Sequence, residues 1–378
     1  MRAPIAILLA ALLAGSARAQ DIKEGSVLDV GGLKATVTKL DALPYVVSEF
    51  TQRFKFDAFD NPKLKELRER YKLDDVVAPG RDEFDRQVLL LDWTHFQFKK
   101  FGRPTANPKG ALEILKGVEE GHTFFCAHYG ATYCSAAASL GWIDRTLALR
   151  RHKDYPGAGA PEHTSTEIWS NQFRKWVVMD PTANMFVEKD GVPLNGVEIR
   201  TEWFEREGKD LVFVVGKERK RYRRADLPIF LARFPGFGDL TVPANEMEKY
   251  GFIGYVPNTN LMDAGDDYGK MFIVKDKWCE AKWHERTNPP NPAVDPYFPI
   301  GQATLSLSVD GGKLRVGLQT MTPNFKEFQV RIDGGPWKVS GEAVLWSLHA
   351  GANRLEARTQ NRFGVDGPVS TVDLAGSP

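Results

Sequence analysis

The chain has 378 residues, of which 42% are hydrophobic and 26% charged, so it is long enough for two or three folded cores and is not a disordered tail. Its 50 basic residues nearly balance 49 acidic ones, and a net charge of +1 provides no overall field for attracting DNA, RNA or anionic lipid. We therefore expect no nucleic-acid partner. The strongest local charge run, KERKRYRR at 217–224, is interpreted as a solvated basic loop, with contact to an anionic glycan or wall polymer as the alternative.

The first residues predict a secretory signal peptide over 1–19. They carry one positive charge at Arg2, an apolar stretch over 5–13 and the small-residue motif Ala17-Arg18-Ala19, after which cleavage is expected. The apolar stretch is shorter than the roughly 20 residues that a membrane-spanning helix needs. We expect a protein exported to the periplasm or the extracellular space, without membrane insertion.

Residues 20–80 are predicted to contain strands and then a helix that lead into a central domain. Polar and apolar residues alternate over 21–56, which is typical of strands. Asn61 and Pro62 are suited to the N-cap and first position of a helix over 62–72. Two more amphipathic helices are predicted over 82–101 and 108–118.

The central domain is assigned to residues 81–288. Its second half is predicted to hold a helix near 195–206 and strands at 211–215 and 271–278. Residues 289–301 contain five prolines and are interpreted as a linker. The last segment, 302–378, has regularly spaced strand-like runs separated by glycine-rich turns, which predicts a β-sandwich of immunoglobulin or fibronectin type.

Cys126 is predicted to lie in the first turn of a helix that ends at Gly141. Residues 126–140 are rich in alanine and lack proline. Free N–H groups and the helix dipole at such an N-terminus favour a thiolate, although a cysteine among small residues is by itself more often a buried packing side chain. The mid-helix Cys134 fits that second description. Eight residues on one helix span about 12 Å, which prevents a disulfide between the two, and the third cysteine, Cys279, leaves an odd count.

A hairpin over 163–180 offers a base and an orienting acid. If HTSTEIW and FRKWVVMD are strands joined by a turn at Asn171-Gln172, then His163 pairs with Asp180, Glu167 with Trp176, and Trp169 with Arg174. Directly opposite residues have Cβ atoms about 5 Å apart, so the aspartate is expected to reach the imidazole. Each residue alone also has an ordinary structural interpretation, His163 as a surface histidine and Asp180 as a turn initiator before proline.

In combined spacing these residues resemble the transglutaminase-like core of the papain-like superfamily. Gly141 follows Cys126 by fifteen residues and Arg145 by nineteen, Glu167 follows His163 by four, and the hairpin ends in WVVMDPT at 176–182. The similarity covers roughly residues 85–185. It implies an α+β fold in which a helix packs on an antiparallel sheet, and a catalytic triad of Cys126, His163 and Asp180.

The resemblance implies an exported cysteine enzyme that transfers acyl groups through a thioester, either as a transglutaminase or as a peptidase or amidase. Its substrate would be a protein, a peptide or a cell-wall component. Arg145, Glu167 and Trp176 are expected to support the site, with Arg145 ordering the end of the Cys126 helix. The alternative is a non-catalytic envelope protein whose core and β-sandwich bind glycan or protein.

The oxyanion hole is the part of the site that the residues leave open. The stretch Thr123-Phe124-Phe125-Cys126-Ala127 lacks the glycine or glutamine that many family members carry before the cysteine. The Cys126 N–H is one expected donor, and Trp93, His95, His122 and His128 are the candidates for the second. No CxxC or HxxxH pair is present to give a zinc site, so we expect no metal and no other cofactor.

Overall fold

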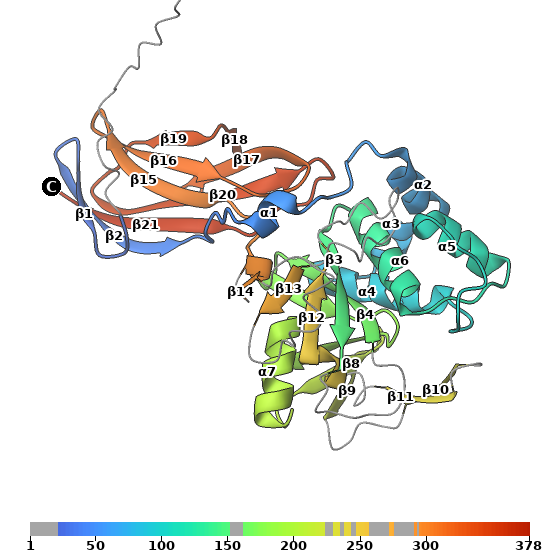
Figure 1. Ribbon diagram of the computed structural model, residues 1–378. Coiled ribbons are helices and arrows are strands. Elements are labelled where there is room, and N and C mark those ends of the chain that lie inside the picture. The colour runs from blue at the N-terminus through green and yellow to red at the C-terminus, as the bar shows by residue number, and fades with distance from the viewer. Residues whose placement is uncertain are drawn as a thin grey trace, which may run out of the picture.

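The computed structural model describes residues 22–151, 162–223, 230–234, 238–242, 247–256, 272–275, 291–292 and 295–378 (Figure 1). The predicted signal peptide and Cys279 lie outside these residues. The described part is a mixed α/β structure with seven α-helices and mostly antiparallel sheets. None of its helices is both long and apolar enough to cross a membrane.

The seven helices are α1 Glu49–Arg53, α2 Pro62–Arg70, α3 Leu73–Val77, α4 Glu83–Gln97, α5 Gly110–Glu119, α6 Cys126–Ser139 and α7 Gly196–Arg206. The five helices predicted from sequence are confirmed, although α4 ends four residues early because Phe98 takes an extended backbone. At the start of α2, Asn61 Oδ1 accepts the N–H of Lys63 at 3.0 Å, as expected of an N-cap followed by proline.

A six-stranded sheet forms the centre of the molecule. Its strands, in spatial order, are β14 Asn291–Pro292, β13 Phe272–Lys275, β12 Phe252–Tyr255, β3 Asp144–Arg150, β4 Glu162–Ser170 and β5 Lys175–Met179. On one face, Ile168, Val177 and Met179 pack with α4 and α6 in one hydrophobic cluster. On the other, Leu149 and Trp169 belong to a second cluster that includes residues of α7. Both faces of the sheet are therefore covered, which explains why nearly all residues of β4 and β5 are buried, the polar ones of β4 included.

A smaller four-stranded sheet, in the order β7 Val192–Pro193, β6 Met185–Lys189, β8 Val212–Val215 and β9 Lys220–Arg223, follows the central hairpin. The described part of the basic run, 217–223, is mostly exposed, as predicted for a solvated segment, but it is not a loop throughout, because β9 pairs with β8. Arg221 forms an ion pair with the buried Glu188, and Arg219 with Asp85. Nearby acids thus hold part of the basic run in place. A separate two-stranded sheet contains β10 Phe230–Phe234 and β11 Gly238–Val242.

Two antiparallel sheets surround a separate core toward the C-terminus. One has the order β1 Val27–Val30, β2 Leu33–Asp41, β21 Ser370–Ser377, β20 Gly351–Asn361, β17 Phe325–Ile332 and β18 Lys338–Ser340, and the other contains β15 Thr304–Asp310, β16 Lys313–Gln319 and β19 Ala343–Trp346. Leu314 and Trp346 of one sheet share a hydrophobic cluster with Phe328 and Val372 of the other.

The first two strands do not lead into the central domain, contrary to our expectation for residues 20–80. Strand β2 pairs along its length with β21, and Ala35 and Val37 are buried in the C-terminal core. Within the segment 289–301 that we interpreted as a Pro-rich linker, β14 pairs with β13 and Phe298 lies in the central core, so its described residues are packed on the central domain. Alternating residues indicate that a strand forms, but they do not determine which sheet it joins.

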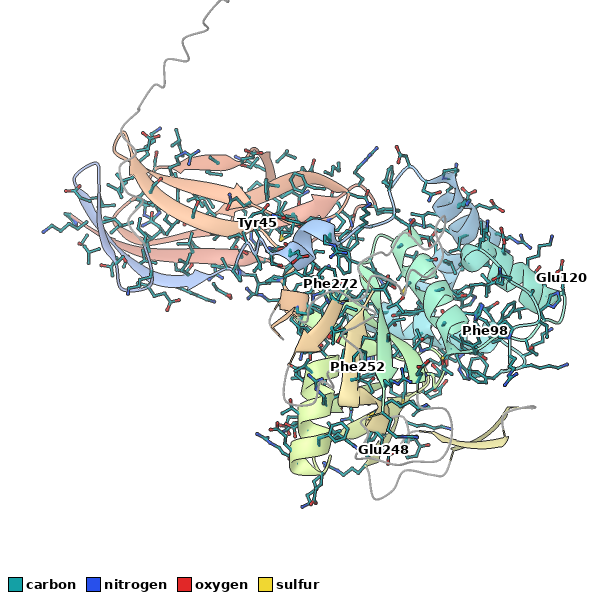
Figure 2. All side chains as sticks on the ribbon, in the orientation of Figure 1. Tyr45, Phe98, Glu120, Glu248, Phe252 and Phe272 are labelled. Carbon is teal, nitrogen blue, oxygen red and sulfur yellow. The ribbon has the colours of Figure 1, made fainter. Side chains whose placement is uncertain are left out.

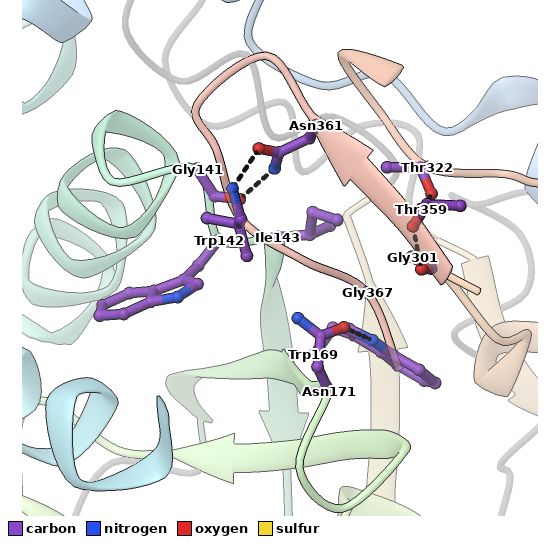
Figure 3. A pocket seen from close by; sticks show the side chains of 11 residues that line it. Gly141, Trp142, Ile143, Trp169, Asn171, Gly301, Thr322, Thr359, Asn361 and Gly367 are labelled. Carbon is purple, nitrogen blue, oxygen red and sulfur yellow. Dashed lines mark hydrogen bonds between the residues drawn. The ribbon is translucent and has the colours of Figure 1, made fainter. Parts of the chain in front are cut away.

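The C-terminal part contacts the end of α6. Gly141 has φ +84° and stops the helix, as predicted. Its carbonyl accepts a hydrogen bond from Asn361 Nδ2 at 2.8 Å (Figure 3), and a side chain at this position would run into Phe363. The helix that begins at Cys126 is therefore fixed at its far end by Asn361, the last residue of β20, and by Phe363 in the loop that follows.

Candidate active site

His163 and Asp180 lie side by side in the central sheet. His163 is the second residue of β4, Asp180 directly follows β5, and His163 Nε2 lies 2.7 Å from Asp180 Oδ2. Both residues are buried, with 6% and 1% of their surfaces exposed. The contact expected from the hairpin is present, but the register differs from the predicted one.

The hairpin is shifted by two residues relative to our prediction. Glu167 pairs with Val178 and Trp169 with Trp176. Four residues, 171–174, form the turn in place of the two that we predicted, and Arg174 has a positive φ of +54°. A bond from Trp169 Nε1 to Asn171 Oδ1 at 2.9 Å ties the asparagine side chain to the first strand. His163 therefore reaches Asp180 diagonally across the ladder.

Asp180 is fixed by hydrogen bonds on both carboxylate oxygens. Oδ1 accepts the backbone N–H groups of Thr182 and Ala183, both at 3.0 Å, while Oδ2 faces the imidazole. Burial acts to raise the pKa of Asp180, but attraction to the His163 ring and these hydrogen bonds outweigh it and lower the pKa. Asp180 is therefore an ionised acceptor at neutral pH, so His163 Nε2 must carry the proton that is shared with it.

Cys126 is the first residue of α6 and is half-buried. Neither Cys126 nor Cys134 is in a disulfide, in agreement with their expected spacing on one helix. No side chain caps this helix, because Phe125 occupies the N-cap position. His128 N–H donates to the Phe125 carbonyl at 2.9 Å, which leaves the N–H groups of Cys126 and Ala127 to bind an anion.

The packing of α6 along the sheet places Cys126 toward the His163 end of β4. Cys134 Sγ lies 3.7 Å from Thr146 Oγ1, and Thr146 is the β3 partner of Thr166. One turn earlier, Gly130 faces the methyl groups of Thr164 and Thr166. Each step back along α6 thus follows β4 back toward its start, and the next turn begins at Cys126.

The helix and the imidazole belong to opposite faces of the sheet. Thr164 faces α6, whereas His163 pairs with Leu149, which lies in the cluster on the other face. His163 lies toward the same end of β4 as the N-terminus of α6, beside Glu162, the first residue described after the gap at 152–161.

Of the four oxyanion candidates, His95 is the one that contacts the hairpin end. Its Nδ1 lies 3.1 Å from the carbonyl oxygen of Pro181, the residue after Asp180. His128 is in the first turn of α6, where burial lowers its pKa to about 4, and its Nδ1 has no hydrogen-bond partner within the described structure. His122 binds the Thr105 hydroxyl, and Trp93 packs against Tyr71.

Arg145 and Glu167 form a buried ion pair between β3 and β4. Both side chains have no exposed surface, and Arg145 Nε donates to Glu167 Oε2 at 2.9 Å. Glu167 Oε1 accepts the N–H of Gly196 at 2.7 Å and the hydroxyl of Tyr297 at 3.1 Å. Our expectation that Arg145 orders the end of the Cys126 helix is therefore wrong, because its partners lie in β4 and near residue 297.

Aromatic rings enclose the Arg145 guanidinium. Its central carbon lies 4.0 Å from the ring centre of Trp176, 4.1 Å from Tyr255 and 5.1 Å from Tyr297. Trp176, which we expected to support the site, also donates from Nε1 to the Phe298 carbonyl at 2.9 Å. Sequence reasoning missed both tyrosines, since no local signal links residues more than 100 positions away to Arg145.

Asp144, the residue before Arg145, is buried without being part of the Arg145–Glu167 ion pair. The carboxyl group is buried, and burial raises its pKa well above the ordinary value while nearby Asp57 raises it further. Within the described part of the chain, no group of three His, Cys, Asp or Glu side chains is arranged to hold a metal ion.

No protein-family model and no curated protein matches the chain. Among solved structures, it aligns with a protein from Cytophaga hutchinsonii described as a candidate cysteine protease, with 12% identity and a TM-score of 0.27. The alignment covers 40% of this chain and 49% of that structure, so the chain spans about half of its length.

Proposed function

We propose that this protein is a cysteine acyl-transfer enzyme in which Cys126 is the nucleophile, His163 the base and Asp180 the orienting acid. The observation that carries the proposal is the 2.7 Å hydrogen bond between two buried side chains, His163 and Asp180. This bond lies at one end of the β4–β5 hairpin, and α6 packs against the same sheet. A nucleophile, a base and a group that orients the base are the three parts that such chemistry needs.

The protonation pattern of the pair is suited to proton abstraction. Because ionised Asp180 accepts the proton on Nε2, the neutral ring presents the lone pair of Nδ1. In the proposed reaction His163 Nδ1 takes the proton from Cys126 Sγ, and Sγ attacks a carbonyl carbon to give a tetrahedral anion. The backbone N–H of Cys126 is the proposed donor to that anion.

The proposed intermediate is a thioester. The tetrahedral anion collapses, the bond to the leaving amine or alcohol breaks, and His163 returns its proton to that group. Water then attacks in hydrolysis, or a second amine in acyl transfer, again with His163 as the base. We place this chemistry in a transglutaminase-like core over residues 85–185, joined to an immunoglobulin- or fibronectin-like C-terminal sandwich, in an exported protein acting on protein, peptide or cell-wall substrates.

The test is single-turnover acylation by p-nitrophenyl acetate. Wild type should release about one p-nitrophenolate per chain in a burst, and mass spectrometry should place a hydroxylamine-sensitive acetyl group on Cys126. Cys126→Ala should abolish the burst. Asp180→Asn should slow it by roughly 10² to 10⁴, since the amide would donate toward Nε2 and place the ring proton on Nδ1.

The control is Cys134→Ala, which removes a buried thiol on the same helix and should leave the burst intact. A burst that survives in Cys126→Ala would refute the assignment of the nucleophile. Equal rates for wild type and Asp180→Asn would show that the His163–Asp180 pair is only structural, and would favour the non-catalytic envelope alternative.

A further inference from the structure

An exposed aromatic side chain stands at the end of α4 that lies next to Cys126. Phe96 is 68% exposed. Helix α4 runs antiparallel to α6, since Tyr133 Oη lies 3.3 Å from the Gln87 carbonyl and the Phe98 ring stacks on Tyr129 at 3.7 Å (Figure 2 labels Phe98). The C-terminal end of α4 is therefore beside the N-terminal end of α6.

Phe96 is also connected to the segment that carries Asp180. Its ring lies perpendicular to the His95 ring, with centroids 5.0 Å apart, and His95 Nδ1 contacts the Pro181 carbonyl oxygen. The half-buried ring of Phe125 directly precedes Cys126 and packs edge-on against His128 at 4.8 Å. One largely exposed ring and one half-buried ring thus lie near the N-terminal end of α6, where the proposed nucleophile is placed.

The buried aromatic rings of this region already pack on one another, so only the exposed rings have surface with which to contact a ligand. Phe98, Phe124 and Tyr129 are buried and pack on one another. Phe96 contributes little to that core, because most of its surface faces solvent. A large exposed aromatic ring near a proposed nucleophile suggests a substrate-binding role more strongly than a ring on a remote surface does. Aromatic side chains bind apolar groups through large contact areas and favourable ring geometries.

We propose that Phe96 and Phe125 form the binding site for the acyl side chain of the substrate, and that this side chain is aromatic or bulky and apolar. The inference rests on the proposed function, because it takes the acyl carbonyl to be held at Cys126. It adds the substrate class: small or charged acyl groups would gain no contact with the two rings.

The proposal can be tested without knowing the natural substrate, by comparing two alkylating probes. Iodoacetamide and N-benzyl iodoacetamide react by the same step, in which Sγ forms a bond to the CH₂ carbon, iodide leaves and the thiol proton is released. The measured quantity is the ratio of the two alkylation rates at Cys126, determined by mass spectrometry and divided by the same ratio for glutathione. The ratio cancels any change in thiol reactivity.

Wild type should prefer the benzyl probe by about tenfold over glutathione, as expected from covering part of one aromatic ring. Phe96→Ala should bring the ratio close to that of glutathione, and Phe96→Leu should keep part of the preference. The matched control is Val339→Ala, because Val339 is also 68% exposed but lies on β18. This variant should behave as wild type.

A wild-type ratio equal to that of glutathione, or an unchanged ratio in Phe96→Ala, would overturn the acyl site. Neither result would affect the proposed function, which depends on the acetate burst and on its loss in Cys126→Ala. Conversely, a benzyl preference without any burst would support the binding site and contradict the enzyme.

Discussion

Replacing Glu167 by glutamine should strongly destabilise the central domain, even though the change is nearly isosteric. Glutamine Oε1 can still accept from the Gly196 N–H and the Tyr297 hydroxyl. Its amide nitrogen, however, would replace the oxygen that accepts from Arg145, so that two donors face each other. The guanidinium would then remain buried without its counter-charge.

The size of the effect follows from the burial of the pair. Because Arg145 and Glu167 have no exposed surface, solvent cannot screen the charge that is left. Removing one partner of a buried ion pair costs about 3–5 kcal/mol, whereas exposed pairs contribute about 0–1 kcal/mol. At about 2 °C per kcal/mol for a large domain, the melting temperature should fall by about 6–10 °C.

The assay is thermal unfolding of a four-variant cycle. Arg145→Met would place an apolar, polarisable side chain among Trp176, Tyr255 and Tyr297, so the double variant Arg145→Met, Glu167→Gln should recover at least half of the loss. A shift below about 2 °C for Glu167→Gln, or a double variant less stable than both single variants, would refute the reasoning. In the surface control, Glu69→Gln removes an exposed pair with Lys65 and should change the melting temperature by less than about 1 °C.

Two further perturbations test local features of the structure. Burial raises the pKa of Glu83 to about 7, against an ordinary 4.5, so the protonated form is favoured in the folded state and stability should fall as pH rises from about 4.5 to about 7. Melting curves over this range should show a flatter decline for Glu83→Gln, and an unchanged slope would contradict the assignment. Gly141→Ala should lower the melting temperature more than Gly351→Ala, since both have positive φ but only Gly141 is pressed against Phe363. Equal effects would show that the Phe363 contact contributes nothing.

The parts of the fold that sequence predicted well are those that local chemistry determines. Asn61 and Pro62 start α2, Gly141 ends α6, and the position of Cys126 in the first turn depends only on those local signals. Helix α4 ends earlier than expected although its apolar spacing continues through Phe98 and Phe101. Those two residues bury their rings after the helix has ended, so periodicity alone overestimated its length.

Contacts distant in sequence could not be predicted in the same way. The alternating residues of β2 are compatible with any half-buried sheet, and its pairing with β21 joins segments more than 300 positions apart. The basic run at 217–224 gave no sign of its acidic partners, because Asp85 and Glu188 belong to other elements. The contacts of Arg145 with Tyr255 and Tyr297 could not be predicted either, since no sequence motif marks these two tyrosines as its partners.

The hairpin shows why a contact between two side chains can be predicted correctly from an incorrect register. Our pairing was displaced by two residues, and a displacement of two keeps every side chain on its own face of the sheet, whereas a displacement of one would have reversed it. His163 and Asp180 therefore remained on one face, and a diagonal contact replaced the direct one. The predicted contact between His163 and Asp180 depended on the alternation of side chains along the two strands and not on the position of the turn. For the same reason, the alternation of side chains places His163 on the face of the sheet opposite α6, where it pairs with Leu149.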